Sequence, residues 1–529
     1  MRKGSYRDSI TMLRISNELG KLEGVTQAAA VMGTQLNMRI LKALGFTGPD
    51  LEAARADDMI IAIEAREDKF IDQAFRRADE LLSVATFGHG TAALPTSLEA
   101  AIAQNPDASM VVISVPGHFA KREALRALKS GLNVFLFSSN VDVEDELELK
   151  HYALSRNLLL MGPDCGTSIL NNVVLGFGNV LRSGPVGIVS ASGTGLQQVS
   201  TLLDRVGIGV SQGIGTGGND LSDGVGGLMM MRGIELLDRD SQTKVIILIS
   251  KPPGEITARR VVEVASRCSK PVIINFMGLK EEEHIKATSP NCTFVPTLEE
   301  AASMAAAKVA GITSMEVERS GSDTIRRHTD DATITAESAR LAPPQRYVSG
   351  LFSGGTLCYE AQVVMAPLVG EIHSNAPIIK ALSVPEGQEY PEGHICVDMG
   401  AEEFVVGRAH PMIDFTLRKL RILSEARKRS VAVILLDVLL GYGSNPDPAL
   451  ELVPAITEAK RVAERDGGRY LSVVASIVGT LGDPQGLERQ ARMLGEAGVV
   501  LEPSNAAAAR TAARIALRWE VAQEVSVRV

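Results

Sequence analysis

The sequence lacks the residue patterns that disulfide frameworks, zinc sites and nucleic-acid surfaces require. Its five cysteines, at positions 165, 268, 292, 358 and 396, include no CxxC pair, so neither a disulfide framework nor a thiolate zinc site is expected and no metal is predicted. The formal net charge of −9 argues against a nucleic-acid partner. The mixed basic run 408–428 fits solvated helix faces better than a track for a phosphate backbone.

Long hydrophobic runs are absent as well. Apolar segments such as Val245–Ile249 fall far short of the roughly 20 residues that a membrane helix needs. The opening MRKGSY is not followed by a hydrophobic stretch of signal-peptide length. We therefore expect a cytoplasmic protein without a membrane partner. With 529 residues, of which 45% are hydrophobic, the chain can bury several cores and should form three or four domains.

The most informative segment runs from Gly184 to Gly227. A short β-branched strand, Val186–Ser190, leads through the turn SGTG into a helical pattern that starts near Gln197. Free N–H groups and the helix dipole at such a turn favour phosphate or carboxylate, and glycine lets the anion approach the backbone. The turn lacks the lysine of a Walker A loop, so a tight connection without a ligand is the alternative.

A second copy of this arrangement follows later in the chain. YVSGLFSGGTLCYEAQVVM, from Tyr347, again reads as strand, glycine turn and helix. The following segments also match in order: KVIILIS with VAVILLD, PVIINFMG with LSVVASIVG, and TFVPTLEEAASMAAAKVA with VVLEPSNAAAARTAARIA. This repetition predicts two diverged α/β modules, the second with insertions.

The rest of the chain supports a domain division. Residues 1–85 predict a small N-terminal α/β cap, and 86–182 alternate strand and helix as in a Rossmann-like parallel sheet. The two repeats then fill 183–311 and 347–529. The polar stretch 312–346, with Pro343-Pro344 near its end, is the predicted linker.

Several long motifs carry a family resemblance. In order, ASMVVISVPG, LLLMGPDCGTS, VGIVSASGTG, GIGTGGND and VIILISKPPGE resemble the α subunit of succinyl-CoA synthetase, which implies a CoA-binding-type domain followed by flavodoxin-like ligase domains. Over its whole length, including RKGSYRDSITMLRIS and VGRAHPMIDFTLR, the chain is similar to the FdrA family of acyl-CoA-synthetase-like proteins.

The sequence departs from the synthetase pattern at two places, which concern the cofactor and the chemistry. The synthetases have a glycine-rich nucleotide loop where this chain reads ATFGHGTAALPTSLEAA, so the resemblance assigns no certain cofactor and leaves CoA as an option. They also use a phosphorylated histidine flanked by glycines, whereas His284 stands beside Glu281, Glu282 and Glu283. We interpret His284 as a surface helix residue.

The resemblance implies an enzyme subunit. A branch of the FdrA family is associated with oxamate carbamoyltransferase of ureide catabolism, which implies carbamoyl phosphate or its acceptor as ligand, further protein subunits as partners and an oligomer. The alternatives are an acyl-CoA synthetase of the succinyl-CoA ligase type, acting on an acyl substrate, and a noncatalytic scaffold or metabolite sensor. The predicted phosphate- or substrate-binding residues are Ser192, Gly193, Thr194, Gly195, Gly217, Gly218, Asn219, Gly354, Gly355 and Thr356.

Three polar residues are the catalytic candidates. Arg408 and His410 precede a predicted helix, and a guanidinium fork suits a planar carboxylate. A loop that packs onto its own helix is the alternative. Lys251 follows a strand, where its cation could face a ligand, although Lys251-Pro-Pro-Gly could equally form only a rigid turn.

Overall fold

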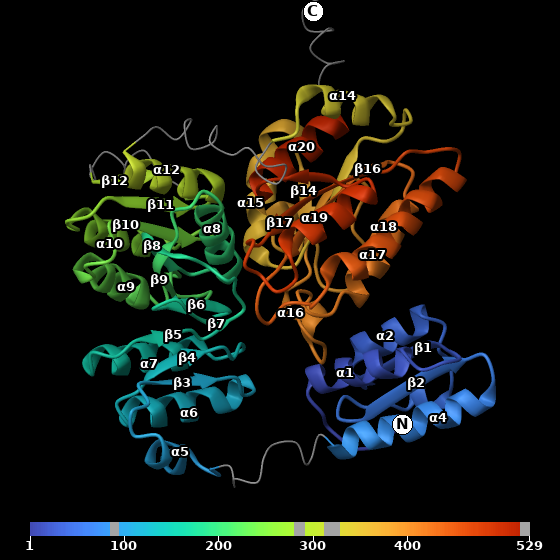
Figure 1. Ribbon diagram of the computed structural model, residues 1–529, viewed down its shortest axis with the longest axis horizontal. Coiled ribbons are helices and arrows are strands. Elements are labelled where there is room, and N and C mark those ends of the chain that lie inside the picture. The colour runs from blue at the N-terminus through green and yellow to red at the C-terminus, as the bar shows by residue number, and fades with distance from the viewer. Residues whose placement is uncertain (85–94, 280–290, 312–327, 519–529) are drawn as a thin grey trace, which may run out of the picture. The chain divides into compact units, whose positions relative to one another are not determined.

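The computed structural model describes residues 1–84, 95–279, 291–311 and 328–518 (Figure 1). The chain forms two compact units. Unit 1 comprises residues 1–95 and 399–418, and unit 2 comprises 96–398 and 419–529. Within the described ranges, no helix combines the length and the apolar character that crossing a membrane requires.

Unit 1 is built on a two-stranded antiparallel sheet of β1 (Val25–Met32) and β2 (Met59–Ala65). Alternation along β1 sends Ala30 and Met32 into one core and Ala29 and Val31 into another. Helices pack against both faces of this small sheet, whose strands are partly buried. The helices are α1 (Ser9–Gly20), α2 (Gln35–Ala43), α3 (Pro49–Glu52) and α4 (Asp68–Val84). The short helix α16 (Glu402–Val405), from the later segment, also belongs to unit 1.

Unit 2 begins with a three-stranded parallel sheet in the order β3-β4-β5. Each strand follows a helix, which is the crossover arrangement expected of a Rossmann-like domain. On α6, Ala120, Ala124 and Ala127 are fully buried at helical spacing. The elements are α5 (Leu98–Gln104), β3 (Met110–Ile113), α6 (Gly117–Lys129), β4 (Asn133–Leu136), α7 (Val143–Ser155) and β5 (Leu160–Met161).

The first repeat forms a seven-stranded sheet in the order β12-β11-β10-β8-β9-β6-β7. Its parallel part has the flavodoxin-like order 2-1-3-4-5 when β8 is counted first. The antiparallel hairpin β6 (Thr167–Leu170) and β7 (Val173–Gly176) extends one edge. The remaining elements are β8 (Ser183–Ser190), α8 (Gly193–Arg205), β9 (Val210–Gly215), α9 (Leu228–Arg239), β10 (Val245–Ser250), α10 (Glu255–Ser266), β11 (Val272–Phe276), β12 (Cys292–Phe294) and α12 (Leu298–Ala310).

The second repeat forms a six-stranded parallel sheet in the order β14-β15-β13-β16-β17-β18. Without the extra edge strand β14, the order is again 2-1-3-4-5. The elements are α14 (Asp331–Ala339), β13 (Tyr347–Phe352), α15 (Gly355–Val369), β14 (Ile372–Ser374), the 3-10 turn η1 (Lys380–Leu382), β15 (His394–Asp398), α17 (Thr416–Ala426), β16 (Val431–Leu439), α18 (Pro448–Arg465), β17 (Ser472–Val478), α19 (Leu487–Glu496), β18 (Val500–Glu502) and α20 (Asn505–Leu517).

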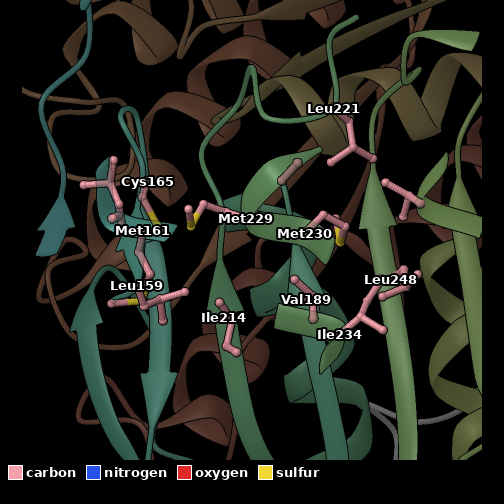
Figure 2. Close-up of a cluster of buried hydrophobic side chains, with 14 of the residues drawn as sticks. Leu159, Met161, Cys165, Val189, Ile214, Leu221, Met229, Met230, Ile234 and Leu248 are labelled. Carbon is pink, nitrogen blue, oxygen red and sulfur yellow. The ribbon is translucent and has the colours of Figure 1, made fainter. Parts of the chain in front are cut away.

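Burial explains why these strands read as continuous apolar runs. Every residue of β10, β11, β16 and β17 is buried, as expected of parallel strands whose faces are both covered by helices. One hydrophobic core is shared by the Rossmann-like domain and the first repeat. Met161 of β5 belongs to the same buried cluster as Val189 of β8 and Met229 of α9 (Figure 2). The predicted α/β fold, with a Rossmann-like domain and two flavodoxin-like repeats, is confirmed.

Candidate functional site

The two glycine turns meet in unit 2. Each lies at the carboxyl end of a parallel strand and opens a helix, α8 after β8 and α15 after β13, as the sequence predicts. Ser192 Oγ and Thr356 Oγ1 are 2.6 Å apart and buried. The Cβ that Gly354 lacks would stand 2.8 Å from Thr194 Cγ2, so the contact depends on glycine there. The two turns are therefore in direct contact.

Both helices present unused donors at this meeting point. Ser192 caps α8 by accepting a hydrogen bond from Gly195 N at 2.9 Å. Within the described part of the chain, the N–H groups of Gly193 and Thr194, like those of Gly355 and Thr356, have no intramolecular acceptor, as is usual in a first helical turn. Two helix N-termini facing one place create a region suited to an anion.

Charged side chains flank the paired turns. A Cβ on Gly355 would stand 3.2 Å from Lys251 Nζ and 2.6 Å from Asp398 Oδ2. Lys251, at the carboxyl end of β10, is exposed. Desolvation raises the pKa of Asp164, and the positive charge of Lys251 opposes that shift. Lys251 thus lies beside the paired turns, where an anion would meet its charge.

The glycine-rich loop after β9 is held near the same place. A Cβ on Gly218 would stand 3.1 Å from Asp164 Oδ2, while Gly217 packs against the carbonyl of Pro163. Gly218 and Asn219 are exposed. Of the predicted loop residues, Gly217 therefore serves close packing, Gly218 faces solvent next to Asp164, and Asn219 is exposed.

Arg408 and His410 lie in unit 1, not in the unit that holds the glycine turns. The Arg408 guanidinium donates to Asn37 Oδ1 at 3.0 Å and pairs with Asp414, and only 7% of its side chain is exposed. Burial lowers the pKa of His410 to about 4. The Arg408 guanidinium thus already has intramolecular partners. The catalytic role of Arg408 and His410 stays a prediction.

Sequence reasoning missed residues that support the turns. Asp437 of β16 accepts hydrogen bonds from Ser353 N at 2.9 and 3.0 Å, which fixes the entry to α15. Asp398 ends a buried strand and comes to the site only through the fold, although an acidic residue at a strand's carboxyl end is a usable signal. Cys165 is buried among apolar side chains, which raises its pKa to about 11 (Figure 2). His284 lies outside the described residues.

Two family models match separate segments of the chain. A family model described as "AllF, heavy metal-associated domain" matches residues 1–93, and a CoA-ligase model matches residues 351–515. Soft metal ions prefer thiolate and thioether ligands, and imidazole suits zinc and copper. Residues 1–93 contain no cysteine and a single histidine, His89, and the described residues hold no group of three or more His, Cys, Asp or Glu side chains that could bind a metal ion. The residues present therefore do not fit a heavy-metal centre built from thiolate or clustered imidazole ligands.

Individual proteins similar to this chain include further CoA-dependent enzymes. The chain is 30% identical to the succinate–CoA ligase [ADP-forming] α subunit of Aquifex aeolicus over 178 residues, which cover 32% of this chain and 57% of that subunit. A dinucleotide-forming acetyl-coenzyme A synthetase 1 from Ca. Korarchaeum cryptofilum aligns over 79% of this chain and 85% of its own at 17% identity. Its TM-score of 0.28 is too low to carry an argument.

One relative matches over nearly its full length. The uncharacterized protein YahF of Escherichia coli K12 is 40% identical over 509 residues, or 96% of each chain. Taken with the CoA-ligase model and the succinate–CoA ligase match, this identity shows that the chain belongs to the family of YahF and is related to the acyl-CoA synthetases.

Proposed function

We propose that unit 2 transfers an acyl group between phosphate and CoA, with the phosphoryl group held at the paired glycine turns. The observation that carries the proposal is the convergence of the α8 and α15 N-termini, where Ser192 Oγ and Thr356 Oγ1 are 2.6 Å apart. The match of residues 351–515 to a CoA-ligase model supports CoA as the acyl acceptor.

In the proposed step, the CoA sulfur attacks the acyl carbon of an acyl phosphate. The C–S bond forms, the bond from the acyl carbon to the phosphate oxygen breaks, and the thiol proton leaves to solvent or to the departing phosphate. The N–H groups of Gly193, Thr194, Gly355 and Thr356 and the Lys251 ammonium would stabilise the negative charge on that phosphate. No covalent enzyme nucleophile is needed.

The test measures phosphate binding by calorimetry and acyl-CoA formation from acetyl phosphate and CoA. A Gly193→Ala variant should weaken phosphate binding about tenfold or more, because the added methyl group fills the space in front of the α8 N-terminus. Gly495→Ala is the matched control, since nothing lies within 4 Å of its Cβ. Unchanged phosphate affinity in Gly193→Ala would refute the site.

Carbamoyl transfer is the competing chemistry. The matched families and relatives point to CoA ligases, and none of those described above is named a carbamoyltransferase. Carbamoyl phosphate should therefore be offered beside acetyl phosphate in the same assay. CoA-independent consumption of carbamoyl phosphate, with a ureido acid formed from oxamate, would favour the FdrA-type reaction over the one proposed.

A further inference from the structure

The hydroxyl of Thr167 is the feature of this site that the chain's own contacts leave unexplained. Thr167 is 1% exposed, and its Oγ1 has no hydrogen-bond partner among the residues that the structure describes. Buried hydroxyl groups are nearly always paired with protein or water. An unpaired one beside a candidate anion site is therefore informative about what that site binds.

The Thr167 hydroxyl lies directly against the start of α8. The Cβ that Gly193 lacks would stand 3.2 Å from Thr167 Oγ1 and 3.5 Å from Gly166 Cα. Gly193 and Gly166 are both partly exposed. Because neither residue has a side chain, the hydroxyl lies close to the start of α8, where the N–H groups of Gly193 and Thr194 have no acceptor among the described residues.

The backbone fixes the position of this hydroxyl. Thr167 begins β6 and is paired with Gly176 of β7, and the preceding carbonyl of Gly166 accepts from Phe177 N at 2.8 Å. On the other side, a Cβ on Gly215 would stand 2.3 Å from Thr167 O. A donor held in place before the ligand arrives loses little entropy on binding.

We propose that Thr167 is a ligand of the phosphoryl group. Its hydroxyl donates a hydrogen bond to an oxygen of a tetrahedral oxyanion that binds at the α8 N-terminus. The inference rests on the proposed function and adds a donor that neither glycine turn supplies. Thr167 comes from the hairpin at the edge of the first repeat's sheet, so the anion would contact a third segment of unit 2.

Charge at the rim is compatible with an anion. Lys251 supplies a positive charge beside Gly355, where Asp398 also lies, and Asp164 lies beside Gly218. Desolvation raises the pKa of Asp164, and the positive charge of Lys251 opposes that shift. Asp164 also has a φ of +54°, in the left-handed region that is costly for a non-glycine residue; such residues gather at functional sites.

The experiment titrates the full chain with inorganic phosphate and follows binding by calorimetry. Thr167→Val keeps the shape of the side chain and removes only the hydroxyl. It should weaken phosphate binding about tenfold, the effect of losing a hydrogen bond to a charged group, while leaving the thermal midpoint unchanged or higher, because no protein partner is lost. Thr167→Ser should restore most of the affinity.

Thr201→Val is the matched control. Thr201 is fully buried on α8 but donates to the carbonyl of Gln198 at 3.0 Å, so its loss should lower stability without changing phosphate affinity. If Thr167→Val bound phosphate as tightly as the parent while Gly193→Ala bound it more weakly, this inference would be overturned and the proposed function would stand. A parent chain that does not bind phosphate would overturn both.

Discussion

Glu360 is the residue whose environment has the clearest electrostatic consequence. It lies on α15, one turn after Thr356, and is fully buried. Its carboxylate accepts from Leu298 N of α12 at 2.7 Å and from Asn505 Nδ2 of α20 at 2.8 Å. Desolvation outweighs these bonds and raises the pKa of Glu360 to about 7. The Glu360 carboxyl thus links the two repeats, and its burial there raises its pKa.

This shift makes stability depend on pH. The unfolded state loses the Glu360 proton near pH 4.5, its ordinary value, and the folded state near pH 7. Between these values the folded state binds more protons, so the free energy of unfolding contributed by Glu360 is fully present below pH 4.5 and falls as pH rises toward 7. The loss is up to about 3 kcal/mol.

Glu360→Gln should remove this pH dependence, since an amide does not titrate. Denaturant midpoints measured from pH 4.5 to 8, for the variant and the parent, give the two slopes. Glu458→Gln, at a half-buried residue whose side chain is 41% exposed, serves as control. Identical slopes for Glu360→Gln and the parent would show that Glu360 keeps an ordinary pKa in the folded state.

At the scale of elements, a buried charge cluster anchors the glycine-rich loop. Lys150 of α7 contacts Glu146 Oε1 at 2.6 Å and Asp220 Oδ1 at 2.8 Å, and all three side chains are fully buried. Asp220 also accepts from Met229 N and Met230 N at the start of α9. The cluster therefore connects α7, the loop and α9, and it fixes the loop that packs on Asp164.

Replacing Lys150 by Met should destabilise this part of the fold by about 3 to 5 kcal/mol, because two buried carboxylates lose their counterion. Limited proteolysis at the loop and the denaturant midpoint report the effect. Lys121→Met is the control: this lysine on α6 also contacts two carboxylates, Asp145 and Glu148, but is 34% exposed. Its loss should cost at most about 1 kcal/mol, and equal effects of the two changes would contradict the argument.

At the scale of the whole molecule, Arg205 joins the two repeats within unit 2. It lies at the end of α8, is 6% exposed, and donates to the carbonyls of Gly479 at 2.9 Å, Pro503 at 3.0 Å and Ile477. All three acceptors belong to the second repeat. One guanidinium therefore satisfies three buried carbonyl groups across the repeat junction.

Arg205→Leu should uncouple the repeats, because the three carbonyls lose their donor and each unsatisfied group costs about 1 to 3 kcal/mol. Scanning calorimetry should then show two transitions for unit 2 where the parent shows one. Arg461→Leu, on the exposed side of α18, should leave the thermogram unchanged. A single transition at an unaltered midpoint in Arg205→Leu would mean that other contacts hold the repeats together.

Unit 1 yields a prediction of its own. Its match to a heavy-metal-associated family model is not accompanied by cysteine ligands, since the first cysteine of the chain is Cys165. Titration of the full chain with Zn²⁺ or Cu⁺ should therefore show no tight site attributable to residues 1–93. Stoichiometric binding that disappears in a variant with substitutions only in those residues would contradict this expectation.

Local patterns in the sequence were sufficient to predict most of the fold. Apolar β-branched runs followed by glycine turns and helical spacing identify β8 with α8 and β13 with α15, because side-chain periodicity is set by the geometry of each element. Repetition of the same elements in the same order then predicts two similar sheets, and both have the order 2-1-3-4-5. The domain boundaries and the roles of the site residues stay predictions.

Only the tertiary structure decided how the site is composed. Ser192 and Thr356 are 164 positions apart, and no local pattern indicates that their hydroxyls touch. Packing likewise brought Thr167, Asp398 and Lys251 to the paired turns, and it left Arg408 bonded within unit 1. The physical reason is that periodicity specifies which face of an element is buried, whereas the meeting of two loops depends on how whole sheets and helices pack.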